Sequence, residues 1–390
     1  MIKRQRCNHA PSGDLFNRIP CSIDPAVSSI LERALEGKPP SRDDAIGLFG
    51  CKGQELNALI MVADELRRRT VGNTVTYVVN RNINFTNVCV AKCGFCAFSR
   101  SPDAPDRYLF SVEEIARRAE EAWRMGATEV CIQGGLHPRI DASFYAEICK
   151  TIKMRAPSIH IHAFSPMEIV HGAEGAGLSI TESIKMLKEA GLDSMPGTAA
   201  EILDDQIRRI ICPGKMTTKK WVEVIKTAHR LGIRTTSTMM YGHVDKPEHW
   251  VSHLALLREI QIETSGFTEF VPLSFTYPNT SIYRNGMARP GATGAEDVKM
   301  HAVSRLILND AIRNIQVSWV KLGLKLAQLC LNAGANDFGG TLMDESISRS
   351  AGASGGQSIS AEEFNRLIND LGRNPAQRST TYQILRSFEK

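Results

Sequence analysis

The chain has 390 residues, of which 43% are hydrophobic and 23% charged, and its formal net charge is +5. These proportions are typical of a soluble globular protein, and no apolar run reaches the roughly 20 residues that span a bilayer. The mild positive charge is spread along the chain. The densest clusters of basic residues, at 67–69 and 219–220, fall on expected helices, where they are interpreted as solvent-exposed faces. This argues against a nucleic-acid or membrane surface.

The first 13 residues carry no periodic pattern, and residues 23–70 are expected to be helical. Ser41 and Asp44 resemble a capping box, with Asp44 in place of the usual glutamate. We therefore predict a helical extension over residues 1–70. An apolar stripe at helical spacing supports it: Leu56, Leu59, Ile60, Ala63 and Leu66.

After Val71, apolar β-rich segments alternate with amphipathic segments, which predicts parallel β/α architecture. Eight such units favour a closed (β/α)8 TIM-type barrel over a doubly wound sheet, with 71–310 as its core and 311–390 completing it. The expected strands are 75–85, 129–133, 159–164, 192–195, 234–240, 268–273, 315–320 and 335–338. The expected helices are 112–125, 142–154, 179–190, 221–231, 250–262 and 299–311, with 360–371 closing the barrel.

Three of the ten cysteines, Cys89, Cys93 and Cys96, follow the first expected strand with CxxxCxxC spacing, and Phe95 precedes the third. A [4Fe-4S] cluster normally takes four cysteines, so one held by three keeps an iron open for another ligand. The spacing therefore predicts chemistry at a metal centre. The other cysteines are too scattered for a disulfide framework, so we expect reduced thiols and a cytoplasmic location.

A structural zinc site and a chance grouping of thiols stay open as alternatives for the triplet. A zinc site needs a fourth Cys or His at matching spacing, and the nearest candidates, Cys51 and His137, form no knuckle pattern. Three unrelated buried thiols would also give a triplet, although this spacing makes coincidence improbable.

Polar and glycine residues follow several expected strands, where barrels gather their active sites. Gln133, Gly134 and Gly135 could let the backbone approach a cofactor, or could form an ordinary β-to-α turn. Thr198 and Glu201 could cradle a ribose or carboxylate at a helix N-terminus, while Glu201 could equally be a first-turn acid.

Three further strand-end residues, His162, His243 and Asp337, could bind substrate or carry protons. Any one of them could instead be a structural residue whose hydrogen bonds are satisfied. Their shared placement at one face of the predicted barrel favours at least one substrate contact, so we expect them to be catalytic.

The cysteine motif with Phe95 resembles the radical SAM superfamily, and residues 81–89 resemble its subgroup that builds deazaflavin and menaquinone precursors. Within that subgroup, residues 160–167, 192–205 and 235–243 most resemble the CofH family. The resemblance runs from about Gln54 to Leu371, which is most of the chain.

The resemblance implies a [4Fe-4S] cluster on the three cysteines, whose open iron chelates S-adenosyl-L-methionine (SAM). An electron from an external donor then cleaves SAM to a deoxyadenosyl radical. Its implied substrates are L-tyrosine and 5-amino-6-(D-ribitylamino)uracil. Tyrosine is cleaved, and its 4-hydroxybenzyl radical is added to the uracil during synthesis of the deazaflavin precursor of coenzyme F-420.

The resemblance also implies a CofG-like partner subunit that completes the ring, and we expect it as a separate chain because this one has a single cysteine triplet. The nearest alternatives are the two radical SAM enzymes of futalosine-route menaquinone synthesis. They usually carry Pro-Gly-Gly-Gly where this chain has 195–200. A non-catalytic iron–sulfur or zinc scaffold is the alternative from another class.

Overall fold

The structure is a computed structural model that describes residues 23–388. The segment predicted to be loose, 1–13, lies outside the described residues. Within 23–388 the strands form one six-stranded sheet, in the order β2-β3-β4-β5-β6-β7, and one four-stranded sheet, in the order β10-β9-β1-β8. The strands are β1 Thr74–Val78, β2 Asn80–Ile83, β3 Glu129–Ile132, β4 His160–Ala163, β5 Ser194–Met195, β6 Arg234–Tyr241, β7 Phe267–Ser274, β8 Asp337–Gly340, β9 Asn374–Arg378 and β10 Ile384–Ser387.

The two sheets join into a closed ring of parallel strands. A parallel bridge joins Phe270 of β7 to Ile315, and a second joins Gln316 to Asp337 of β8. Strand β8 pairs with β1, which runs on through Val79 into β2, and β2 pairs with β3. The predicted TIM-type barrel is therefore confirmed: seven of the eight expected strands are present, and residues 315 and 316 fill the remaining position by single bridges.

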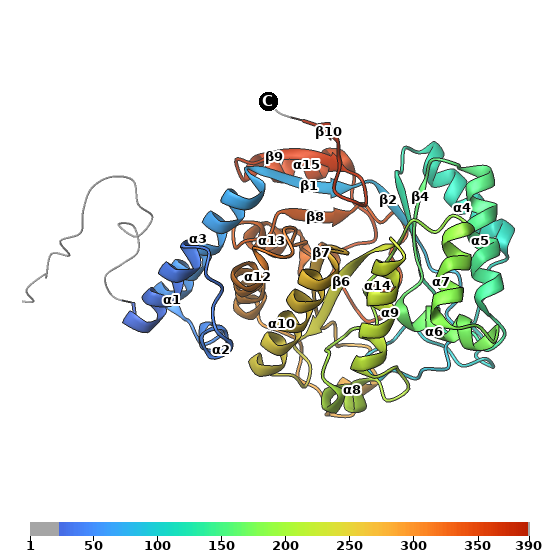
Figure 1. The fold of residues 1–390 in the computed structure, drawn as a ribbon, viewed down its shortest axis with the longest axis horizontal. Coiled ribbons are helices and arrows are strands. Elements are labelled where there is room, and N and C mark those ends of the chain that lie inside the picture. Colours follow the sequence, from blue (N-terminus) through green and yellow to red (C-terminus); the bar gives the residue numbers. More distant parts are fainter. Residues whose placement is uncertain (1–22, 389–390) are drawn as a thin grey trace, which may run out of the picture.

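Helices surround the barrel strands, with α4 to α7 on one flank and α10, α12 and α13 on the other (Figure 1). The six helices predicted between strands are confirmed, each within a few residues at its ends. The helices are α1 Pro25–Leu35, α2 Arg42–Leu48, α3 Gly53–Val71, α4 Val112–Arg124, α5 Ala142–Arg155, α6 Pro166–Gly175, α7 Ile180–Glu189, α8 Asp205–Ile211, α9 Thr218–Arg230, α10 Pro247–Thr264, α11 Ser281–Arg284, α12 Gly294–Leu308, α13 Trp319–Leu331, α14 Ile347–Ser350 and α15 Ala361–Asp370.

The predicted N-terminal extension is helical, as three helices rather than one continuous element. Helix α3 packs against α1 and α12, and α2 packs against α10. The predicted capping box is present, because the Ser41 hydroxyl accepts the Asp44 N–H and the Asp44 carboxylate accepts the Ser41 N–H, each at 3.2 Å. None of the helices in residues 23–388 combines the length and apolar character needed to cross a membrane.

One prediction about the C-terminal part is wrong. Of the expected strand 315–320, only residues 315 and 316 pair, and α13 begins at Trp319. The expected last helix, 360–371, is present as α15, whose Phe364 packs against Phe338 of β8 and Tyr77 of β1. The chain then continues into β9, which was not expected and which pairs in parallel with β1 from Thr74 to Tyr77. Strand β10 then returns antiparallel to β9. The turn between them brings Thr380 and Tyr382 against the barrel strands, where they bond Glu129 and Glu269.

Candidate active site

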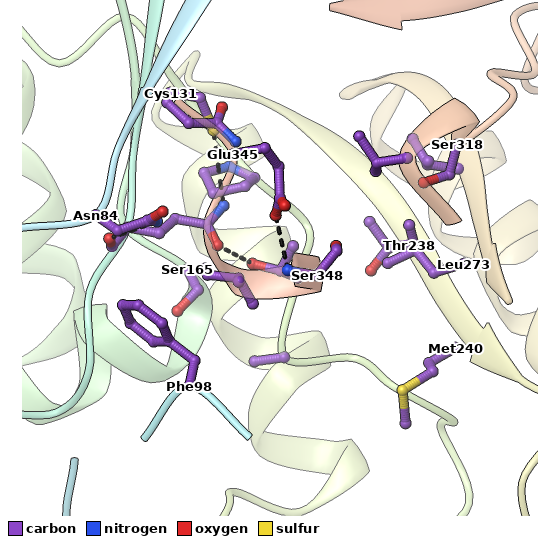
Figure 2. Close-up of a pocket in the computed structure, with 18 of the residues that line it drawn as sticks. Asn84, Phe98, Cys131, Ser165, Thr238, Met240, Leu273, Ser318, Glu345 and Ser348 are labelled. Carbon is purple, nitrogen blue, oxygen red and sulfur yellow. Dashed lines mark hydrogen bonds between the residues drawn. The ribbon is translucent and has the colours of Figure 1, made fainter. Parts of the chain in front are cut away.

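A cavity of about 410 Å³ occupies the inside of the barrel. Figure 2 shows Thr238 and Leu273 facing it from β6 and β7, and the segment carrying Glu345 and Ser348 crossing beside it. That segment is fixed because the Glu345 carboxylate accepts the Ser348 N–H at 2.8 Å. A partly enclosed chamber of this kind suits a reaction that must be kept from water.

The cysteine loop begins where β2 ends, and Cys89, Cys93 and Cys96 all line the cavity as free thiols. The loop is tied to the α8 end of the barrel, because the Gly94 N–H donates to the Ile211 carbonyl at 2.9 Å. Backbone bonds thus hold the loop in place, which leaves the three sulfur atoms available to a ligand.

The donor arrangement fits an iron–sulfur cluster better than a single metal ion. Among the described residues, no three Cys, His, Asp or Glu side chains converge as the ligands of one ion do. Three thiolates on a cluster need not converge so closely, since each binds a different iron. The zinc alternative requires four donors around one ion, and residues 23–388 do not supply them.

Lys215 places a positive charge beside the cysteines, and no sequence motif pointed to it. Its ammonium group forms an ion pair with Glu201 and lies 5.0 Å from the centre of the Phe95 ring. Burial raises the pKa of the Cys93 thiol to about 12, while the Lys215 charge acts to lower it. A cation at this position therefore favours the thiolate form that binds iron.

Gly134 and Gly135 pack tightly against the base of the cysteine loop. A Cβ atom on Gly135 would lie 2.2 Å from the Val88 carbonyl oxygen, and one on Gly134 would lie 2.6 Å from the Phe85 ring. The Gly135 N–H also donates to the Thr86 carbonyl at 2.9 Å. The two glycines line the cavity together with Gln133, so they both dock the loop and border the site.

Glu168, at the start of α6, supports this glycine turn and was missed in the sequence. Its carboxylate accepts the Gly134 N–H at 2.9 Å, and the Ser165 N–H and hydroxyl at 2.7 Å each. Burial raises its pKa to about 7. The pattern Ser165-x-x-Glu168 directly after an expected strand is a capping box, and this signal could have revealed the residue.

Thr198 and Glu201 line the cavity on a loop that precedes α8. Because α8 begins at Asp205, the expectation of a helix N-terminus at Glu201 is wrong, and so is the alternative of a first-turn acid. The loop instead holds Ala199 and Glu201 at φ values of 61° and 46°, in the left-handed region. Non-glycine residues adopt this conformation rarely, often at functional sites.

Of the three predicted catalytic residues, His162 alone lines the cavity. Burial lowers its pKa to about 4, so the imidazole is neutral at pH 7. Asp337 lies behind the lining, paired with Arg378 at 2.5 Å. His243 bonds the Met240 carbonyl at 3.1 Å. Asp337 and His243 are therefore held by structural bonds and do not border the cavity.

Lys321, in the first turn of α13, is a second cation that the sequence did not reveal. It lines the cavity, and its ammonium group forms no hydrogen bond or ion pair with any other described side chain. Burial lowers its pKa, opposed by the charges of Glu345 and Glu201. An unpaired ammonium group on a cavity wall is suited to bind a carboxylate.

Residues 83–257 match the family model of the radical SAM superfamily, and residues 264–390 match that of the CofH/MqnC C-terminal region. A protein of Methanocaldococcus jannaschii named 5-amino-6-(D-ribitylamino)uracil--L-tyrosine 4-hydroxyphenyl transferase is 56% identical over 351 residues, covering 89% of this chain and 98% of that protein. The Methanothermobacter thermautotrophicus protein of the same name is 53% identical, covering 93% and 98%. This chain belongs to the CofH family of radical SAM proteins.

More distant relatives place the CofH family in context. An FO synthase of Mycobacterium tuberculosis is 49% identical over 95% of this chain, which covers 44% of that protein. Methylornithine synthase (PylB) has the same fold, with a TM-score of 0.71 at 19% identity, covering 89% of this chain and 97% of PylB. The hydrogenase maturase HydG from Carboxydothermus hydrogenoformans matches with a TM-score of 0.70 at 16% identity, covering 91% of this chain and 80% of HydG. The two solved structures confirm the barrel fold of this CofH-family chain.

Proposed function

We infer that this protein is a radical SAM transferase that cleaves L-tyrosine and adds its 4-hydroxybenzyl group to 5-amino-6-(D-ribitylamino)uracil, a step in deazaflavin synthesis. The observation that carries this conclusion is identity of 53–56% to transferases of that name, over about nine-tenths of this chain. The cysteine triplet on the wall of a barrel cavity supports it, because such a reaction needs cluster ligands beside an enclosed space for the substrates.

When bound, the [4Fe-4S] cluster and SAM supply the radical that abstracts hydrogen from tyrosine. We propose that Cys89, Cys93 and Cys96 hold the cluster. The residues proposed to surround SAM all line the cavity beside the triplet: Phe95, Gln133, Gly134, Gly135, Thr198 and Glu201. The ion pair with Lys215 orients the Glu201 carboxylate at this end of the cavity.

Tyrosine carries a carboxylate that must be fixed while its side chain reacts. We propose that Lys321 binds this carboxylate, since its ammonium group borders the cavity without an ion-pair partner among the described residues. Anchoring one end of the amino acid positions its amino group for hydrogen abstraction, and such positioning contributes much of the catalytic benefit.

We also propose a separate CofG-like partner and an external electron donor. The similarity to FO synthase supports the partner, because this chain matches less than half of that longer protein. Ring closure of the deazaflavin is then the task of the partner. His243 and Asp337 are proposed to hold the cavity wall rather than to touch substrate.

The test is to incubate the cluster-loaded protein with SAM, a reductant, tyrosine and the ribitylaminouracil. We expect deoxyadenosine and the benzylated pyrimidine, identified by mass spectrometry, with both products dependent on tyrosine. If deoxyadenosine forms equally well without tyrosine and no benzylated pyrimidine appears, the assignment fails. A protein that binds zinc and does not respond to SAM would support the scaffold alternative instead.

A further inference from the structure

The cavity has a second polar end, which we call the floor, formed by Glu129, His162, Glu269, Arg378 and Thr380. Glu129 is the first residue of β3, whereas Gly134 follows the end of that strand beside the cysteine loop. Five residues at about 3.3 Å each separate the two points by roughly 16 Å. The floor therefore lies at the opposite end of the barrel from the proposed cluster.

Most charges at the floor already have partners. The Arg378 guanidinium bonds both carboxylate oxygens of Asp337, at 2.5 and 2.9 Å. Glu129 accepts the Asn80 amide at 2.8 Å and the Thr380 hydroxyl at 2.7 Å. The Arg378 guanidinium also reaches Glu269 Oε2 at 3.4 Å, so one cation serves two carboxylates, and with Glu129 the floor is acidic overall.

Two polar atoms at the floor accept or donate no hydrogen bond to any described residue. Glu269 uses Oε2 for Arg378 and Tyr382, which leaves Oε1 without a partner. His162 uses Nδ1 for the Ser194 hydroxyl at 2.7 Å, which leaves Nε2 without one. Both side chains line the cavity and are only 6% exposed. Because the two atoms open onto the cavity with their hydrogen-bonding capacity unused, a ligand in the cavity can bond both of them.

We propose that the floor is the subsite for the ribityl chain of the pyrimidine substrate, whose hydroxyl groups bond Glu269 Oε1 and His162 Nε2. This proposal rests on the proposed function, and it adds the position of each substrate in the cavity. Hydroxyl groups can donate to a carboxylate and either donate to or accept from a neutral imidazole. The carboxylate of tyrosine is repelled by the acidic floor, and it finds its cation in Lys321 instead.

The experiment compares the ribitylaminouracil with 5-amino-6-(n-pentylamino)uracil, which lacks the hydroxyl groups. KM for each pyrimidine and for tyrosine is measured in the wild type, Glu269→Gln and His162→Phe. Asp297→Asn is the matched control, because Asp297 is a buried carboxylate that accepts the Tyr241 hydroxyl at 2.6 Å outside the cavity. Equilibrium dialysis of both pyrimidines against the cluster-loaded proteins gives the same comparison without turnover, and circular dichroism checks folding.

We expect the wild type to prefer the ribityl compound, and each floor variant to lose about tenfold to a hundredfold of that preference, as for one hydrogen bond to a buried charged group. KM for tyrosine should stay unchanged in the floor variants. The Asp297→Asn variant should keep the wild-type preference for the ribityl compound. A preference retained in both floor variants overturns the proposal, and so does a raised KM for tyrosine with unchanged pyrimidine binding. If the wild type forms no benzylated pyrimidine, the proposed function is refuted. The ratio of the two pyrimidine affinities measured by dialysis still tests whether the floor binds the ribityl chain.

Discussion

The cysteine end of the cavity and its floor are built in different ways. The cysteine end consists of loops, held by backbone bonds and by close contacts at Gly135, and it carries the cations Lys215 and Lys321. The floor consists of strand residues and the β9–β10 turn, held by side-chain bonds between distant parts of the chain, and it carries unpaired carboxylate oxygen. The cavity thus has a cysteine end with two lysines, of which Lys215 is paired with Glu201, and an acidic floor.

This difference separates two tasks. On the proposed function, the loops hold the cofactor, whereas the strand residues of the floor hold the far end of the pyrimidine substrate. On the same proposal, the unpaired ammonium group of Lys321 favours an amino-acid carboxylate at the cysteine end, and the acidic floor disfavours it. Variants at the cysteine end should therefore change radical formation or tyrosine binding, and variants at the floor should change pyrimidine binding.

The largest effect is expected from Cys93→Ala at the cysteine end. Loss of one of three ligands should remove the cluster and its visible absorbance, and deoxyadenosine formation should fall by more than about a thousandfold, since the radical chemistry belongs to the cofactor. Cys149→Ala is the control, because Cys149 is also buried but lies on α5 away from the cavity. Intact absorbance and SAM cleavage in Cys93→Ala would contradict the assignment of this end.

A smaller effect is expected in the pH dependence of stability, through Glu168 beside the glycine turn. Burial raises its pKa from 4.5 to about 7. Between these values the native carboxyl keeps a proton that the unfolded chain releases, so the free energy of unfolding falls as the pH rises. The full loss is about 3 kcal/mol.

Urea denaturation of the wild type and Glu168→Gln from pH 4 to pH 8 measures this loss of unfolding free energy. The part of the loss that comes from Glu168 should be missing in the variant. Glu269 at the floor also has a pKa raised to about 7 by burial. Glu269→Gln should therefore flatten the same profile. Parallel profiles for all three proteins would mean that neither carboxyl titrates in this window.

The smallest effect is expected from Lys321→Met. Removing the cation should raise KM for tyrosine about tenfold, the cost of one charge-assisted hydrogen bond, with KM for the pyrimidine unchanged. Lys325→Met is the control, because Lys325 is exposed on the same helix. An increase in KM for SAM rather than tyrosine would place the cofactor carboxylate at Lys321 and remove the charge division between the substrates.

The cysteine end could be predicted from the sequence because its chemistry is local. Cys89, Cys93 and Cys96 lie within eight residues, and their spacing alone indicates the ligand count. The barrel was equally predictable, since strands and helices alternate with distinct periods. Segment 315–320 misled because Ile315, Val317 and Trp319 alternate like a strand, although the helix begins at Trp319.

The floor could not be predicted, for the opposite reason. Glu129 and Thr380 bond across 251 residues, and nothing near either residue marks the contact. Strand β9 has the sequence Asn-Pro-Ala-Gln-Arg, which is poor in the β-branched and aromatic residues that favour strands. It is a strand only because β1 offers an edge to pair with, and tertiary contacts of this kind leave no local pattern.

The pairing of β1 with β9 also sets an order of assembly during synthesis. Thr74 pairs with Asn374, so the base of the barrel stays open until the chain has been synthesised through Asn374. The cysteine loop, in contrast, emerges early. A nascent chain therefore passes through a stage with its thiols made and its chamber incomplete, and such long-range pairing is slow to form.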